Sequence, residues 1–223
     1  MTYRWKVKSM NNLAHGNFSI YPGAVAPELC DKIVNLGNQF EAACGKVYTL
    51  DGKGIINQES RNDKIAIIPH KNDTEWLYKE IWDIGYQLNQ QNWNFSIEAV
   101  EELQYSQYFE NHFLGWHRDI VHEKARAAKS NRPELDRKIS ISIQLSDPSE
   151  YLGGMLEINQ NESGDEEAPN LSDAQNRTGE RDIHDLVRPK GSIIAFPSAI
   201  RHRVSPIRKG CRRALVAWIG GRA

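Results

Sequence analysis

Two segments in the first half of the chain carry apolar residues at helical spacing. The first follows Pro27, a residue well suited to the first turn of a helix, and its apolar positions recur every three or four residues. They are Leu29, Ile33, Leu36 and Phe40. Because only one side of this predicted helix is apolar, we expect it to pack on a flat surface such as a sheet.

The second helical pattern begins near Asp73, where the run Asp73-Thr74-Glu75 offers side chains that can cap a helix start. Its apolar face is made of Trp76, Ile81, Ile84 and Leu88. Two amphipathic helices are therefore predicted before residue 95, with a strand between them at 64–68 that Pro69 closes.

From residue 95 onward the pattern becomes mostly that of strands. The clearest case is 138–145, where apolar and polar residues alternate without a break, so that the isoleucines share one face and the polar side chains share the other. The polar face consists of Ser140, Ser142 and Gln144. One face should pack the core while the other is free to line a polar cavity. Further strands are predicted at 18–21, 95–97, 101–108, 155–159, 192–196 and 212–219.

Helices followed by many strands predict an α+β fold that is mainly β, a two-sheet barrel or jelly roll backed by the N-terminal helices. The 223 residues fit a single domain, 1–223, with a supporting region at 1–94 and a β core at 95–220. Residues 161–185 form an acidic insertion that we expect to be solvated and mobile, a substrate-facing lid being the alternative. A basic segment at 124–138 is expected to be a solvated loop, with a surface that faces an acidic peptide or anionic small molecule as the alternative.

Composition narrows the class of protein. The formal net charge is −1, so no global field favours nucleic acid or an anionic membrane. The three cysteines, Cys30, Cys44 and Cys211, lack paired spacing, which argues against a disulfide framework and a thiolate zinc site. No stretch approaches the ~18 apolar residues of a membrane span, and the N-terminus has no signal-peptide pattern. We expect a soluble, cytoplasmic protein; the sequence favours no particular oligomeric state.

A candidate metal site lies in the run Gly115-Trp116-His117-Arg118-Asp119. His117 and Asp119 are two residues apart, so an extended segment points both side chains the same way. His202, beside strand-like sequence near the C-terminus, is the candidate third ligand. Two histidines and one carboxylate are the ligand set of non-haem Fe(II) oxygenases, although manganese also accepts these ligands. The open positions would admit O2 and a chelating 2-oxoacid.

A dicarboxylate co-substrate also needs a cation for its distal carboxylate. Arg212 and Arg213 both begin the last predicted strand and point to opposite faces, so the alternation alone does not choose between them. Tyr105 is a candidate hydrogen-bond donor to the same carboxylate, and Tyr108 is a second one. For each tyrosine, packing in the barrel wall is the structural alternative.

Three stretches resemble the Fe(II)/2-oxoglutarate dioxygenase superfamily, within it the prolyl 4-hydroxylase-like group and its PKHD-type hydroxylase relatives. They are 105–119, which ends in Trp116-His117-Arg118-Asp119; 140–157; and 190–212, in which His202 is followed by Arg203-Val204-Ser205-Pro206 and then by Arg212. The spacing between Tyr105 and His117 is longer than is usual in that family, and the acidic insertion lies outside its pattern.

The resemblance implies a double-stranded β-helix core, Fe(II) held by His117, Asp119 and His202, and 2-oxoglutarate held by Arg212 with help from Tyr105. It thereby chooses Arg212 over Arg213. It also implies that O2 and 2-oxoglutarate are consumed to hydroxylate a C–H bond, with release of succinate and CO2, and it adds ascorbate as a candidate reductant for the iron. The substrate it suggests first is a peptidyl proline.

Other functions stay open at this point. Within enzymes, the substrate could instead be a free small molecule such as an amino acid, or a nucleic-acid base, which the near-neutral charge disfavours. Outside enzymes, the chain could be a β-barrel binding protein without turnover, although the presence of all three ligands and the basic anchor argues against it. A cupin-like metal protein is disfavoured because no histidine pair is clustered in the sequence.

Overall fold

The computed structural model describes residues 13–15, 18–48, 53–120, 135–159 and 186–222. The described strands form one nine-stranded sheet, one four-stranded sheet and two small two-stranded sheets. The long sheet has the order β1-β2-β14-β11-β17-β9-β7-β3, with β8 paired to β17. Its strands are β1 (Leu13–His15), β2 (Phe18–Tyr21), β3 (Ala43–Cys44), β7 (Lys64–Ile68), β8 (Ala99–Val100), β9 (Leu103–Tyr108), β11 (Asp136–Gln144), β14 (Ile193–Pro197) and β17 (Arg212–Gly221).

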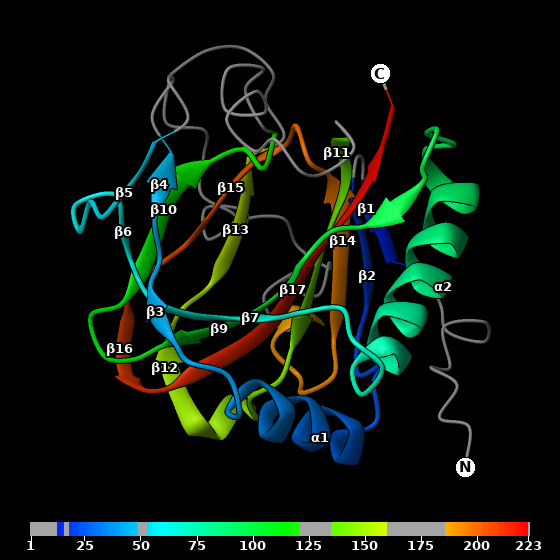
Figure 1. The fold of residues 1–223 in the computed structure, drawn as a ribbon. Coiled ribbons are helices and arrows are strands. Elements are labelled where there is room, and N and C mark those ends of the chain that lie inside the picture. Colours follow the sequence, from blue (N-terminus) through cyan, green and yellow to red (C-terminus); the bar gives the residue numbers. More distant parts are fainter. Residues whose placement is uncertain (1–12, 16–17, 49–52, 121–134, 160–185, 223) are drawn as a thin grey trace, which may run out of the picture.

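The four-stranded sheet has the order β13-β15-β10-β6 and faces one side of the long sheet (Figure 1). Its strands are β6 (Arg61–Asn62), β10 (Phe113–His117), β13 (Leu156–Asn159) and β15 (Arg201–Val204). Two small antiparallel pairs complete the described strands: β12 (Tyr151–Gly153) with β16 (Ile207–Gly210), and β4 (Val47–Tyr48) with β5 (Gly54–Ile55).

Strand β11 shows how the alternation of the sequence becomes the architecture. It pairs with β14 on one side and β17 on the other, in a register that sets Ile141 opposite Ala195 and Ala217. The isoleucines of β11 belong to a fully buried cluster that also contains residues of both helices. The polar face of β11 therefore turns toward the four-stranded sheet, and the predicted division into a packed face and a cavity-lining face is confirmed.

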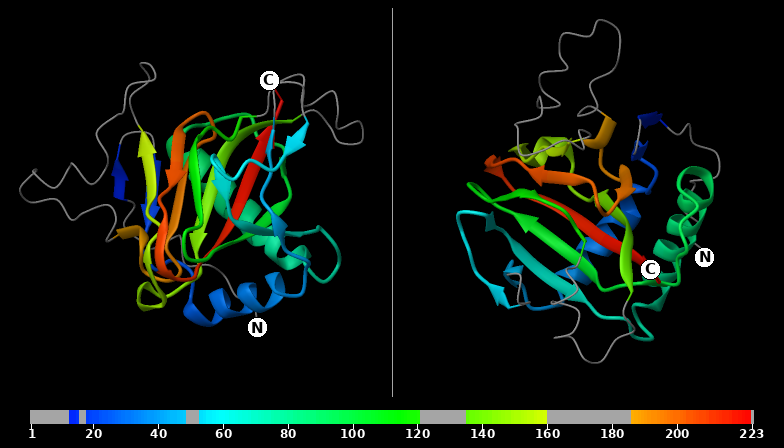
Figure 2. Two further views of the ribbon diagram at one scale, coloured as in Figure 1. Left: turned by 90° about the vertical axis from the view of Figure 1, so that its left-hand side faces the viewer. Right: turned by 90° about the horizontal axis from the view of Figure 1, so that it is seen from above.

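Both helices cover the outer face of the long sheet (Figures 1 and 2). Helix α1 (Pro27–Gly37) has proline in its first turn, and its last residue lies against the ring of Tyr105. Helix α2 (Glu75–Asn92) crosses β11 and β17, and Gly85 lets Ile219 approach its backbone. Since one apolar face per helix is buried against the sheet, the predicted amphipathic arrangement is confirmed.

A second apolar cluster fills part of the space between the two sheets. It contains side chains of both sheets, of the β12–β16 pair and of one residue before β14: Phe18, Ile20, Tyr108, Tyr151, Leu156, Ile158, Leu186, Ile194, Phe196, Val204 and Ile207. The interior of the barrel thus has apolar walls around the polar residues that β11 supplies.

Some sequence predictions fail or fall outside the described residues. No strand forms at 95–97: the side-chain amide of Asn89 donates to the carbonyl of Phe95 at 2.8 Å and accepts from its N–H at 2.7 Å, so this backbone is held by helix α2. Phe40 lies beyond the end of α1. The acidic insertion at 161–185 and most of the basic segment lie outside the described residues. Within the described part of the chain, no helix is long and apolar enough to cross a membrane.

Candidate metal centre and anion pocket

Three side chains predicted from the sequence converge inside the barrel. β10 ends at His117, β15 carries His202, and the antiparallel register sets the two histidines directly opposite each other. Asp119 follows two residues after His117, and its N–H donates to the carbonyl of Ser198 at 2.9 Å. One potential ligand atom from each of the three lies within 4.8 Å of the others, close enough to share one ion.

Backbone carbonyls fix which nitrogen of each imidazole faces the cluster. Nδ1 of His117 lies 2.9 Å from the carbonyl of Gly115, and Nδ1 of His202 lies 3.0 Å from that of Ile200. A carbonyl only accepts, so Nδ1 must carry a proton in both rings, and in the neutral imidazole Nε2 then keeps its lone pair. The Nε2 atoms lie 3.6 Å and 3.5 Å from the carboxylate oxygens of Asp119. Both free lone pairs therefore point to the space in which a cation would sit.

Asp119 is held in place by a short chain of hydroxyls. Oγ of Ser140 donates to Oδ2 of Asp119 at 2.7 Å and lies 2.9 Å from Oγ of Ser198. Burial alone would raise the pKa of Asp119, but His202 and His117 outweigh burial and hold this pKa well below its usual range. The carboxylate is therefore ionised at neutral pH.

His202 is also buried, and burial lowers its pKa to about 4 despite the nearby Asp119. A neutral imidazole is the form that binds a metal. One carboxylate and two imidazoles on a shared centre, with imidazole orientation fixed by backbone acceptors, suit a divalent transition metal such as Fe(II). The donor set thus fits the metal that the sequence suggested.

Removing the hydroxyl that orients Asp119 should weaken metal binding. We expect Ser140→Ala to lower the affinity for Mn(II) or Fe(II) by ~10- to 100-fold, because ligand-orienting hydrogen bonds contribute about that much. The matched control is Ser19→Ala, a buried serine that bonds Asn92 beside α2, outside the cluster. Competition with a chelating dye measures both affinities. Equal affinities in the two variants would contradict an orienting role for Ser140.

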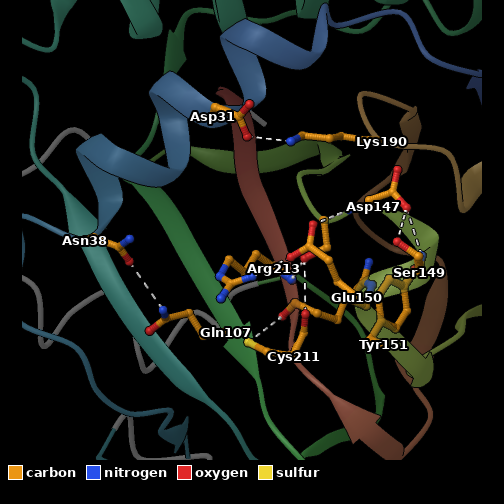
Figure 3. Close-up of polar contacts among 12 residues, drawn as sticks. Asp31, Asn38, Gln107, Asp147, Ser149, Glu150, Tyr151, Lys190, Cys211 and Arg213 are labelled. Carbon is orange, nitrogen blue, oxygen red and sulfur yellow. Dashed lines mark hydrogen bonds and ion pairs between the residues drawn. The ribbon is translucent and has the colours of Figure 1, made fainter.

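A buried arginine lies on the same interior face as Ser140. Arg212 begins β17, is only 5% exposed, and donates from Nε to Oε1 of Gln144 at 3.1 Å. The amide of Gln144 in turn donates to the hydroxyl of Tyr151 at 3.0 Å. Arg213 points to the opposite face and donates to Glu150 at 2.9 Å (Figure 3). Of the two arginines that the sequence left open, Arg212 is the one inside the barrel.

A pocket opens beside Arg212 with about 390 Å³ of empty space, part of it open to solvent. Its polar lining includes Ser142 and Gln144, which follow Ser140 at alternate positions of β11. Four residues of strand span about 13 Å, so β11 joins the metal cluster at Ser140 to the arginine at Gln144 through one column of inward side chains. A small dicarboxylate held at Arg212 would extend along this column toward the metal cluster.

The two candidate tyrosines are separated by the sheet. The hydroxyl of Tyr105 donates to Asn38 at 3.2 Å, and its ring packs under the end of α1 on the helix side. The predicted contact of Tyr105 with the co-substrate is therefore corrected. Tyr108 pairs with Arg212 across β9 and β17, and the Arg212 guanidinium lies 5.7 Å from its ring centroid. Burial raises the pKa of Tyr108, which keeps its phenol protonated as a donor.

Sequence reasoning missed three polar residues that shape the site. Ser140 and Gln144 had a signal, since the alternation at 138–145 predicted a polar cavity wall, but nothing indicated which of them would meet the metal cluster or the arginine. Tyr151 had no such signal. It follows a short capped turn, in which Asp147 and Glu150 satisfy each other's backbone N–H groups (Figure 3). From the end of this turn Tyr151 lines the pocket.

Comparison with known proteins agrees with this architecture. The family model described as the 2OG-Fe(II) oxygenase superfamily matches residues 103–220. A PKHD-type hydroxylase of Xylella fastidiosa (strain M12) is 32% identical over 116 residues, which cover 52% of this chain and 42% of that protein. A PKHD-type hydroxylase of Synechococcus elongatus is 30% identical over 150 residues, which cover 66% of this chain and 56% of that protein. The chain spans about half the length of the curated relatives it matches.

Solved structures share the fold at low identity. A prolyl-4-hydroxylase of Pseudomonas putida superposes with a TM-score of 0.62 at 16% identity, covering 93% of this chain and 94% of that one. A prolyl hydroxylase from Trichoplax adhaerens was solved in complex with a peptide fragment of the hypoxia inducible factor oxygen degradation domain. It superposes with a TM-score of 0.62 at 16% identity, and the match covers 92% of this chain and 83% of that one. The predicted double-stranded β-helix is therefore confirmed.

Proposed function

The chain belongs to the 2OG-Fe(II) oxygenase superfamily, and from that premise we propose that it is an Fe(II)- and 2-oxoglutarate-dependent dioxygenase that hydroxylates a C–H bond. One observation carries the proposal. The cluster of His117, Asp119 and His202 and the buried Arg212 share one barrel interior, joined by the inward face of β11. A binding protein without turnover has no need for both features at this separation.

Each residue has a defined task in this proposal. His117 and His202 would each hold the iron by Nε2, and Asp119 would hold it by one carboxylate oxygen. A metal with only three protein ligands can also bind O2 and a 2-oxoacid. Arg212 offers its remaining N–H groups to the distal carboxylate of 2-oxoglutarate, with Tyr108 beside it as a phenol donor. Ser140 holds the Asp119 carboxylate so that the metal position stays fixed.

Iron, O2 and 2-oxoglutarate together supply the oxidising power when they are bound. In the net reaction, one atom of O2 is inserted into a C–H bond to give an alcohol. The other atom enters 2-oxoglutarate, whose C1–C2 bond breaks to give CO2 and succinate. The apolar walls formed by the barrel's second cluster limit access of water to this chemistry.

For the substrate we propose a proline within a peptide. The curated relatives are named PKHD-type hydroxylases, and the structures that share the fold include prolyl hydroxylases, one of them with a bound peptide. We further propose ascorbate as the reductant that restores Fe(II), and the cytoplasm as the location, which the three free thiols Cys30, Cys44 and Cys211 support.

The test is a coupled assay with proline-containing peptides. The purified protein with Fe(II), 2-oxoglutarate, ascorbate and O2 should release succinate, and one peptide should gain the mass of one oxygen atom on a proline. The control is the same peptide with each proline replaced by alanine. Succinate release without a modified peptide would support the dioxygenase reaction and reject the prolyl substrate, in which case free amino acids and nucleic-acid bases are screened next.

A further inference from the structure

The pocket beside Arg212 contains a second guanidinium. Arg188 lies in the loop that leads into β14 and lines the same pocket. A continuous line of contacts joins the two arginines. Arg212 donates to Gln144, Gln144 donates to Tyr151, and the guanidinium of Arg188 lies 5.7 Å from the ring centroid of Tyr151.

Both guanidiniums keep donors that no described residue uses. Nη2 of Arg188 donates to the carbonyl of Pro148 at 3.3 Å, whereas its Nε is buried and has no hydrogen-bond partner in the described structure. The donor that Arg212 commits is Nε, which leaves its two Nη groups. Among the residues that the structure describes, no carboxylate forms an ion pair with either arginine.

Two cations at one small pocket without a counter-charge are unfavourable. Burying a charge is costly unless it is paired, and two like charges that line one pocket repel each other. An anion that enters between them removes both penalties. A carboxylate suits this position because its two oxygens offer about four acceptor sites, enough for donors from two arginines.

We propose that Arg188 and Arg212 together hold the distal carboxylate of the co-substrate, which makes Arg188 a second anchor and a determinant of selectivity for dicarboxylate 2-oxoacids. The inference rests on the proposed function and deepens it. Tyr151 follows the capped turn and contacts Gln144 and Arg188; its hydroxyl accepts from Gln144 and donates to no described residue, so its proton can complete the set of donors. The pocket then recognises the far end of the co-substrate by charge rather than by shape alone.

The test compares two 2-oxoacids of equal chain length, 2-oxoglutarate and 2-oxopentanoate, which lacks the distal carboxylate. Both are titrated calorimetrically, with Mn(II) present so that no turnover occurs, into wild type, Arg188→Met and Arg188→Lys. Arg208→Met is the matched control, since this exposed arginine of β16 lies outside the pocket lining. We expect Arg188→Met to lower the affinity for 2-oxoglutarate by about tenfold or more, because a charge-assisted hydrogen bond is lost. The affinity for 2-oxopentanoate should not change.

The lysine variant keeps the charge but loses the planar fork, so its affinity for 2-oxoglutarate should fall between those of wild type and Arg188→Met. If wild type binds 2-oxoglutarate more tightly than 2-oxopentanoate and Arg188→Met has the same affinities as wild type, the role of Arg188 is overturned while the proposed function stands. Equal weakening of both oxoacids by Arg188→Met would also overturn it, because the effect would then not depend on the distal carboxylate. A wild type that binds neither oxoacid would overturn the proposed function, and this inference with it.

Discussion

His202→Ala is expected to abolish succinate production. The variant removes one of three ligands and leaves His117 and Asp119 as an incomplete set, so the metal should bind weakly and without a defined geometry. If the lost ligand removes about 4 kcal/mol of stabilisation from the reaction, the rate falls by about 1,000-fold.

The measurement pairs activity with two controls. Succinate release and Mn(II) affinity are compared for wild type, His202→Ala and His70→Ala. His70 is exposed and stacks on Tyr78, outside the cluster, with 4.3 Å between ring centroids. Thermal unfolding shows whether each variant keeps its fold, since His202 also packs edge-on against Phe196. Continued succinate production by a folded His202→Ala would contradict the assignment of the metal ligands.

The parts of the fold that the sequence predicted are those in which side-chain periodicity decides the structure. Strand β7 begins and ends at the residues that the pattern predicted. In β11, the alternation at 138–145 correctly separated the isoleucine face, which packs the core, from the polar face, which lines the cavity. Both faces of β11 are buried, one against helices and one against the barrel interior. A polar residue on an inward position is therefore tolerated only where other polar groups satisfy it, which is why the pattern indicated a cavity.

The failures have tertiary causes. Residues 95–97 have strand-like composition, but the side chain of Asn89 binds the backbone of Phe95 and competes successfully with sheet pairing. Sequence alone also gave no way to see that Tyr151 would reach the pocket from a turn.

The site divides in the same way. His117 and Asp119 are local in sequence, so a two-residue period predicted that they would act together, whereas the meeting with His202 depends on the register of β10 and β15. Tyr105 and Tyr108 are three residues apart and must face opposite sides of β9. Which of them faced the interior was decided by pairing with β17, which sets Tyr108 opposite Arg212.

Arg212→Met should weaken 2-oxoglutarate binding by about 100-fold or more, because two charge-assisted hydrogen bonds to the carboxylate are lost and each contributes at least about 1.5 kcal/mol. Gln144 also loses the donor that satisfies its Oε1, so a small loss of stability should accompany the loss of affinity. Arg212→Lys keeps the charge without the bidentate geometry, so its affinity for 2-oxoglutarate should lie between those of wild type and Arg212→Met. The matched control is Arg213→Met, the neighbouring arginine on the opposite face, whose ion pair with Glu150 is partly exposed and contributes little.

Anaerobic titration of the Fe(II) protein with 2-oxoglutarate gives the affinity, through the visible charge-transfer band expected when a 2-oxoacid chelates iron. Wild type and Arg213→Met should show the band at similar concentrations of 2-oxoglutarate, and Arg212→Met should show it only at far higher ones. Because the metal ligands are intact in all three, any difference reports on the far end of the co-substrate. An equal response in Arg212→Met and Arg213→Met would mean that the buried guanidinium serves the barrel's stability and that the carboxylate is held elsewhere.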